Sequence, residues 1–122
     1  MSQFVDYLHE VFEEFGPISI RRMFGGHGLF FDNLMFALVN DDVLYMKADE
    51  QSSAYFEDLQ LGKFAYNKAG KIMHLSYYQA PEEIYDDREA ATLWARRAFD
   101  AALRANKPKK KTRKKAPKKV SS

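Results

Sequence analysis

Apolar residues near the amino terminus recur at spacings of three and four, which is the period of an α-helix. Acidic residues lie between them and give the segment one polar side. The pattern predicts an amphipathic helix that begins after Ser2 as its N-cap and ends at Gly16 and Pro17. Its apolar positions are Phe4, Val5, Leu8, Val11, Phe12 and Phe15.

From residue 18 to residue 47 the helical period gives way to short apolar runs, separated by Gly, His, Asn and Asp. Runs of this kind between turn-forming residues predict strands. Since a parallel crossover needs about a dozen residues or more, connections this short join antiparallel neighbours. The four predicted strands have the sequences ISIRRMF, GLFF, LMFALV and VLYMK.

The next segment repeats the change from helix to strand. Asp49 predicts the cap of a helix that runs to about Leu59 and ends at Gly62. Two further runs, KFAYN and KIMHLSYY, flank a turn that contains Gly70 and predict a second hairpin.

A helix closes the predicted domain. Pro81 followed by two acidic residues is typical of a first helical turn, and Asp86 with Glu89 resembles a second, capping-box start. The helix is expected to run to about Ala105. The small and apolar residues that form one stripe along it are Ala91, Trp94, Ala95, Ala98, Ala102 and Ala105.

The predicted order is helix, four strands, helix, two strands, helix, which indicates an α+β fold. We expect a two-layer domain over residues 1–106, in which helices pack against an antiparallel sheet. Residues 107–122 contain no large apolar residue before Val120. Such a segment buries too little apolar surface to offset its loss of conformational entropy, so we expect a disordered tail.

The composition of the chain indicates in which cellular compartment the protein is expected. The chain has no cysteine, so it can form neither a disulfide nor a thiolate zinc site. Its first residues lack the basic start and apolar run of a secretory signal. The longest plainly apolar run, residues 34–39, is too short to cross a bilayer. We therefore expect a cytoplasmic protein without membrane contact.

The formal charge of +2 conceals two parts of opposite sign. Residues 107–119 hold nine basic side chains and no acidic one, whereas residues 1–106 hold ten basic and seventeen acidic side chains, a net charge of −7. Because prolines keep the tail extended, each cation can meet a phosphate separately. The alternatives are a tail folded onto the acidic body and a role in solubility alone. The expected non-specific DNA contacts are Lys107, Lys109, Lys110, Lys111, Arg113, Lys114, Lys115, Lys118 and Lys119.

The segment RRMFGGHGLFF, residues 21–31, raises the question of a ligand site. Its spacing matches neither the P-loop nor the dinucleotide-binding pattern. An aromatic platform for nucleic acid is a better alternative, but the adjacent Phe30 and Phe31 must lie on opposite sides of a strand. We favour a hairpin in which Gly25 and Gly26 adopt positive φ angles.

The arginine pair of this segment must also be divided between the two sides of its strand. At least one of Arg21 and Arg22 is therefore expected to be exposed. Both are candidate secondary contacts for phosphate, while an ion pair with a neighbouring acid is the favoured interpretation.

No residue pattern in the chain predicts catalysis. His9, His27 and His74 are dispersed and lack the spacing of a metal-binding pair. An acidic cluster is explained by helix N-termini, which favour carboxylates. Its members are Glu82, Glu83, Asp86, Asp87 and Glu89. We therefore expect no enzyme activity, no metal and no cofactor.

Several motifs, in this order, resemble the N-terminal domain of the TfoX/Sxy family of bacterial competence regulators. They are RMFGGHGLF (22–30), FAL (36–38), LYMK (44–47), SYYQAPEE (76–83) and WARRA (94–98), and the resemblance covers about residues 4–104. It implies a two-layer α+β fold like that of secretion chaperones. It also implies a regulator without catalytic residues that helps a cyclic-AMP receptor protein to activate competence promoters. Longer members have a second, helical domain where this chain has its lysine-rich tail.

The sequence thus predicts a non-enzymatic accessory of transcription or competence, whose body contacts a protein and whose tail contacts DNA. The alternative is a small protein-interaction or chaperone-like module, in which the sheet or a helix binds another protein and the tail is incidental. An enzyme or ligand binder would require a deep pocket lined by His27, His74 and acidic residues.

Overall fold

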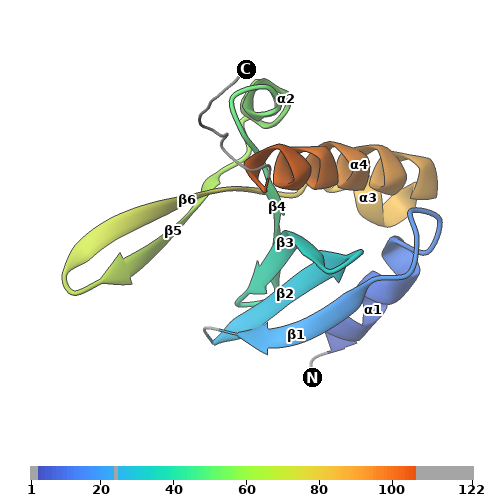
Figure 1. Ribbon diagram of the computed structural model, residues 1–122, viewed down its shortest axis with the longest axis horizontal. Coiled ribbons are helices and arrows are strands. Elements are labelled where there is room, and N and C mark those ends of the chain that lie inside the picture. Colours follow the sequence, from blue (N-terminus) through green and yellow to red (C-terminus); the bar gives the residue numbers. More distant parts are fainter. Residues whose placement is uncertain (1–2, 24, 107–122) are drawn as a thin grey trace, which may run out of the picture.

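The computed structural model describes residues 3–23 and 25–106. In this part of the chain, six strands form one open antiparallel sheet in the order β1-β2-β3-β4-β6-β5, accompanied by four helices (Figure 1). The arrangement confirms the predicted α+β class. The strands are β1 (Ser19–Met23), β2 (Gly26–Phe31), β3 (Leu34–Asn40), β4 (Val43–Lys47), β5 (Lys63–Lys68) and β6 (Lys71–Gln79). The helices are α1 (Gln3–Val11), α2 (Ser53–Asp58), α3 (Glu83–Asp86) and α4 (Arg88–Ala105).

All six predicted strands form, and their ends differ from the prediction by at most two residues. Three hairpins turn on pairs of residues with positive φ angles, at Asp32–Asn33, Asp41–Asp42 and Ala69–Gly70. Such pairs match the right-handed twist of the strands that they connect. The antiparallel register therefore follows from local turn chemistry.

The glycine hairpin between β1 and β2 uses its two glycines differently. Gly25 has a φ of 78°, as predicted, whereas Gly26 does not adopt a positive φ. A side chain at Gly26 would instead collide with the carbonyl oxygen of Val39. Gly26 is thus needed for close strand packing, whereas the prediction had explained it by a positive φ angle.

The helices differ from the prediction more than the strands do. α1 ends at Val11, and residues 12–15 continue as turns that still bury two phenylalanines. α2 begins at Ser53, four residues after the predicted cap at Asp49. Within the described residues, no helix combines the length and the apolar character needed to cross a membrane.

The single helix predicted after Pro81 is divided at Asp87 into α3 and α4. Asp87 is extended, with φ −143° and ψ 110°, and its carboxylate accepts hydrogen bonds from the backbone N–H groups of Glu89 (2.9 Å) and Ala90 (3.3 Å). This is N-cap geometry. The capping role predicted for Asp86 was wrong, because only the residue with the extended backbone directs its carboxylate onto these amides.

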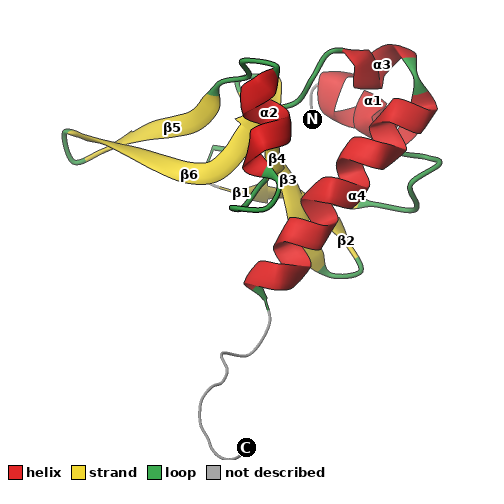
Figure 2. Ribbon diagram, turned by 90° about the horizontal axis from the view of Figure 1, so that it is seen from above, coloured by secondary structure: helices red, strands yellow, loops and turns green. Residues whose placement is uncertain are grey.

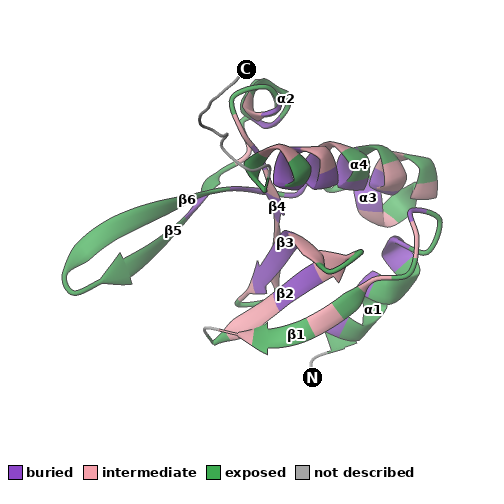
Figure 3. Ribbon diagram, in the orientation of Figure 1, coloured by how far each residue is buried: buried purple, intermediate pink, exposed green. Residues whose placement is uncertain are grey.

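One hydrophobic core lies between the sheet and the helices (Figure 3). Figure 2 shows α4 crossing the sheet over β3, and the small alanines on its buried side permit this close approach. Ala105, the last member of the predicted stripe, is exposed. The largest fully buried side chains are Phe12, Phe36, Phe56, Leu8, Leu29, Leu44, Met46 and Ile84.

Strands β5 and β6 continue beyond this layered body as a two-stranded arm, residues 63–79 (Figures 1 and 3). The arm joins the sheet at its base, where Tyr77 and Tyr78 of β6 pair with β4. Most arm residues beyond the base are exposed. The arm therefore offers side chains to the surroundings on both of its faces.

Candidate functional site

Among the described residues, the helices pack on one face of the sheet, and the second face has a small apolar cluster of its own. We call this second face the open face. Its cluster consists of Leu38, Phe64 and Tyr77, with Met35 and Tyr45 packed against them. Leu38 pairs with Tyr45 across β3 and β4, and the ring centroids of Tyr45 and Phe64 are 4.8 Å apart. These contacts hold the base of the arm against the sheet.

A groove of about 590 Å³ lies on the open face between the arm and strands β1 to β3. We call it the arm groove. Apolar side chains form most of its walls: Met23, Met35 and Leu38 from the sheet, and Phe64, Tyr66 and Leu75 from the arm. Its volume falls within the range of about 300–1,000 Å³ that is usual for binding sites.

The strands carry only basic charged residues, whereas the acidic residues lie in the other segments of the chain. The six strands contain six Lys or Arg and no Asp or Glu, so all seventeen acidic residues lie in helices, turns and loops. Strand alternation and contacts place four of these cations on the open face, namely Arg21, Lys47, Lys68 and Lys71. The strands therefore contribute four cations and no acid to the open face, although residues 1–106 are acidic in total.

Aromatic rings hold two of these cations in place. The guanidinium of Arg21 lies 4.4 Å from the ring centroid of Phe30, and Nζ of Lys47 lies 5.2 Å from that of Tyr77. Burial raises the pKa of Tyr77 to about 12, so its hydroxyl stays protonated at neutral pH. Tyr77 therefore serves as an uncharged contact surface for Lys47.

The predicted phosphate contacts on β1 are both exposed. Arg21 packs on an aromatic ring, and the ion pairs of residues 3–23 and 25–106 are Arg88–Glu10 and Arg104–Asp49. The contact that the structure shows for Arg21 is thus with the ring of Phe30. The nine predicted DNA contacts from Lys107 to Lys119 lie outside the described residues.

The phenylalanine pair of β2 is divided as predicted. The ring centroid of Phe31 lies 4.6 Å from that of Phe15 on the helix side, whereas Phe30 lies under Arg21 on the open face. The partly buried Phe30 is occupied by this contact, so the described residues of the glycine segment offer no row of exposed rings to bases.

The three histidines stay on separate elements, His9 on α1, His27 on β2 and His74 on β6. No group of three or more potential ligands among His, Asp and Glu is positioned for a metal in the described part of the chain. The arm groove is lined by His27, and its described walls include neither His74 nor an acidic residue. It does not match the pocket that an enzyme interpretation required.

The predicted acidic cluster has structural roles. Oε2 of Glu83 accepts a hydrogen bond of 2.6 Å from Nε1 of Trp94, which joins α3 to α4. Asp87 caps α4. Asp87 thus serves a helix N-terminus, in agreement with the interpretation drawn from the sequence, whereas Glu83 serves helix packing.

The sequence interpretation missed the arm groove. One signal was present, since the strands contain no acidic residue. The curvature that brings Tyr66 and Leu75 opposite Met23 is a tertiary feature, and strand periodicity carries no information about it.

Comparison with known proteins identifies the family. Residues 10–102 match the TfoX N-terminal domain. The chain belongs to this family. This TfoX N-terminal domain is 33% identical over 89 residues to protein Sxy of Escherichia coli (strain K12), which covers 73% of this chain and 43% of that protein. It is 31% identical over 93 residues to DNA transformation protein TfoX1 of Aliivibrio fischeri, which covers 76% of this chain and 44% of that protein.

The resemblance to the TfoX/Sxy family noted in the sequence is therefore confirmed. The matched part of the chain covers less than half the length of each of these two relatives. The segment that matches the TfoX N-terminal domain contains the entire sheet and the arm, whereas the lysine-rich tail follows after its end. The open face and its groove are thus features of the shared domain segment.

Proposed function

We propose that this chain is a cytoplasmic accessory protein of transcription or competence, which acts by binding other macromolecules and has no catalytic role. Family membership supports this proposal, since a relative of similar sequence is named a DNA transformation protein. Several polar contacts within the described residues, such as Glu83–Trp94, hold elements of the fold together. Binding surfaces are therefore the features that need explanation.

Contact with DNA is assigned to the tail. The observation that carries this assignment is the run of nine cations without an acid in residues 107–119. α4 leads directly to this segment, and its C-cap Asn106 donates its backbone N–H to the carbonyl oxygen of Ala102 at 3.0 Å. Because phosphate contacts carry no sequence information, the tail would provide affinity for DNA and no choice of site.

Titration of a labelled DNA duplex tests this assignment. The native chain is compared with a full-length variant in which all nine tail cations are Gln. For the native chain we expect log affinity to fall with log salt concentration, with a slope no steeper than about −8, the value for nine phosphate contacts. The Gln variant should lose most of the affinity and of the slope. Equal affinity of both proteins at low salt would reject the assignment.

A second function is favoured by the arm groove. An apolar concave surface of this size fits a protein-interaction module better than a DNA-binding domain, because DNA contacts are mainly polar and charged. The two functions are compatible, with the domain holding a protein partner and the tail holding DNA. By family resemblance, a transcription factor such as a cyclic-AMP receptor protein is a candidate partner.

A further inference from the structure

The arm groove exposes apolar side chains that a folded domain would ordinarily bury. Tyr66, Met73 and Leu75 are exposed by 37%, 39% and 37%. Tyr66 and Leu75 line the groove, and Met73 lies on the same side because it pairs with Tyr66. Clustered exposure of this kind, next to polar residues, marks an interaction surface.

The side chains of the groove suit the apolar side of a peptide better than nucleic-acid bases. Met23 and Met35 line the sheet side, and methionine adapts its shape to irregular apolar partners. Base stacking needs several exposed rings. Of the two aromatic residues in the groove wall, Phe64 is buried against Tyr45, which leaves Tyr66 as the exposed ring.

The charges around the groove indicate which charge the polar side of that peptide should carry. Lys68 lines the groove and pairs with Lys71 near the tip of the arm, and Arg21 and Lys47 lie on the same face of the sheet. Asp41 and Asp42 of the β3–β4 turn line an adjoining hollow, which shares Gly26, His27 and Val39 with the groove. Among the described lining residues Lys68 is thus the one Lys or Arg and none is acidic, and further cations lie on the same face of the sheet. This charge favours a segment that carries carboxylates beside its apolar residues.

The backbone of the sheet decides how such a segment docks. β2 and β3 are hydrogen-bonded to neighbours on both sides, so the floor of the groove presents side chains and no row of unpaired N–H and C=O groups. Addition of a strand would use the sheet edges at β1 and β5 instead. We propose that the arm groove binds an acidic, amphipathic helical segment of a protein partner through side-chain contacts. The inference rests on the proposed binding role and gives its partner a chemical class.

Two matched pairs of variants test the groove. Leu75→Asp places a charge on the groove side of β6, and Ile72→Asp places the same charge on the opposite side of the strand, where Ile72 is 62% exposed. Lys68→Glu reverses a charge in the groove, and Lys63→Glu reverses one that lies over Tyr78 on the other face. All four positions are exposed, so thermal unfolding should show little difference among the variants.

The probe is a set of labelled peptides of about four helical turns, with Leu, Ile, Phe or Met on one side and Glu on the other. Binding is followed by fluorescence anisotropy. Because the tail would attract any acidic peptide, each measurement is made in the native chain and in the full-length variant with nine tail cations replaced by Gln. A second peptide set with Lys in place of Glu has the same apolar side and the opposite charge, and it shows whether binding depends on the carboxylates.

We expect Leu75→Asp to weaken binding of the acidic peptides at least about tenfold, since it removes a leucine side chain that the bound peptide would bury. Lys68→Glu should weaken binding about threefold or more at low salt, and Ile72→Asp and Lys63→Glu should change it less than about twofold. Binding should survive replacement of the tail cations. That last result separates this inference from the DNA assignment, which can fail independently.

Several outcomes would overturn the inference. They are absence of binding in the tail variant, equal effects of Leu75→Asp and Ile72→Asp, or equal affinity for the acidic and basic peptides. Displacement of the peptide by single-stranded DNA from the tail variant would reassign the groove to nucleic acid. A concentration-dependent dimer in sedimentation, abolished by Leu75→Asp alone, would assign it to a second copy of the chain.

Discussion

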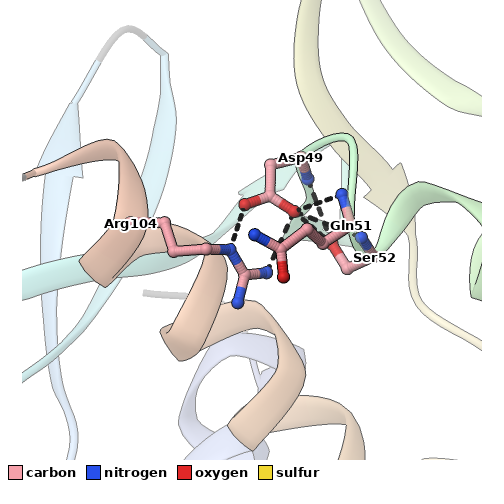
Figure 4. A network of polar contacts seen from close by, with 4 residues as sticks. All are labelled: Asp49, Gln51, Ser52 and Arg104. Atoms are coloured by element: carbon pink, nitrogen blue, oxygen red, sulfur yellow. Dashed lines mark hydrogen bonds and ion pairs between the residues drawn. The ribbon is translucent and has the colours of Figure 1, made fainter.

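Asp49 and Arg104 are joined by two hydrogen bonds although 55 positions separate them in the sequence (Figure 4). Nε of Arg104 donates to Oδ2 of Asp49 at 2.5 Å, and a terminal guanidinium nitrogen donates to Oδ1 at 3.0 Å. Oδ1 also accepts the backbone N–H groups of Gln51 (3.0 Å) and Ser52 (3.1 Å). One carboxylate therefore orders the turn before α2 and attaches that turn to the last turn of α4.

Replacement of this carboxylate should destabilise the domain measurably. We expect Asp49→Ala to lower the free energy of unfolding by about 1–2 kcal/mol, since it removes a turn-capping group and a partly exposed bidentate ion pair. Chemical denaturation monitored by Trp94 fluorescence provides the measurement. The comparison variant is Glu10→Ala, which removes the ion pair between Glu10 and Arg88. Because the Glu10 side chain is 62% exposed, this change should lower the free energy of unfolding by less than about 0.5 kcal/mol. Equal losses in the two variants would contradict the assigned role.

The same pair predicts a pH dependence of stability. Hydrogen bonding to Arg104 holds the pKa of Asp49 below its ordinary value of 3.8. The folded state therefore favours the ionised carboxylate, and the resulting stabilisation is complete above the pKa of the unfolded chain and lost as pH falls through the lower folded pKa. The stability difference between the native chain and Asp49→Asn should be constant from about pH 7 to pH 5 and shrink below about pH 4. Urea titrations across this range decide the point, and a difference that grows at low pH would show that another group dominates.

The sheet was predictable because its determinants are local. Pairs such as Asp32–Asn33 set the hairpins, and the alternation of side chains in β3 and β4 sets their register. The division of Phe30 and Phe31 between the two faces follows from the same alternation. Helix boundaries were less predictable, because adjacent residues such as Asp86 and Asp87 have the same capping chemistry and differ only in backbone conformation.

The candidate site was not predictable from the sequence in the same way. The sequence drew attention to the lysine-rich tail, which lies outside the described residues, and to the glycine segment, whose role is hairpin formation. The arm groove depends on the path of β5 and β6 beyond the sheet, and Leu75 and Met23 meet there across more than fifty residues of sequence. No local pattern encodes that meeting. The absence of acids from the strands was the one visible sign of a distinct face.

Gly26 should be intolerant of substitution although its φ angle is ordinary. A Cβ atom at this position would collide with the backbone carbonyl of Val39, which cannot move without disturbing β3. We expect Gly26→Ala to cost about 1–3 kcal/mol of unfolding free energy. Gly62→Ala is the matched control, because a Cβ there meets no atom within 4 Å, and it should be neutral or slightly stabilising. Thermal unfolding of both variants distinguishes this account from one in which any glycine replacement is harmful.

The start of α4 offers a test of the corrected boundary. Asp86 and Asp87 are adjacent, both exposed and equal in charge, so Asp86→Ala and Asp87→Ala change the net charge identically. Only the carboxylate of Asp87 accepts the N–H groups of Glu89 and Ala90. Asp87→Ala should therefore lower the free energy of unfolding by about 1 kcal/mol, and Asp86→Ala should change it by less than about 0.5 kcal/mol. Because the amides of Glu89 and Ala90 donate to this carboxylate, loss of Asp87 should appear as faster amide hydrogen exchange at these two residues. Faster exchange in the Asp86 variant instead would return the helix start to the residue that the sequence had suggested.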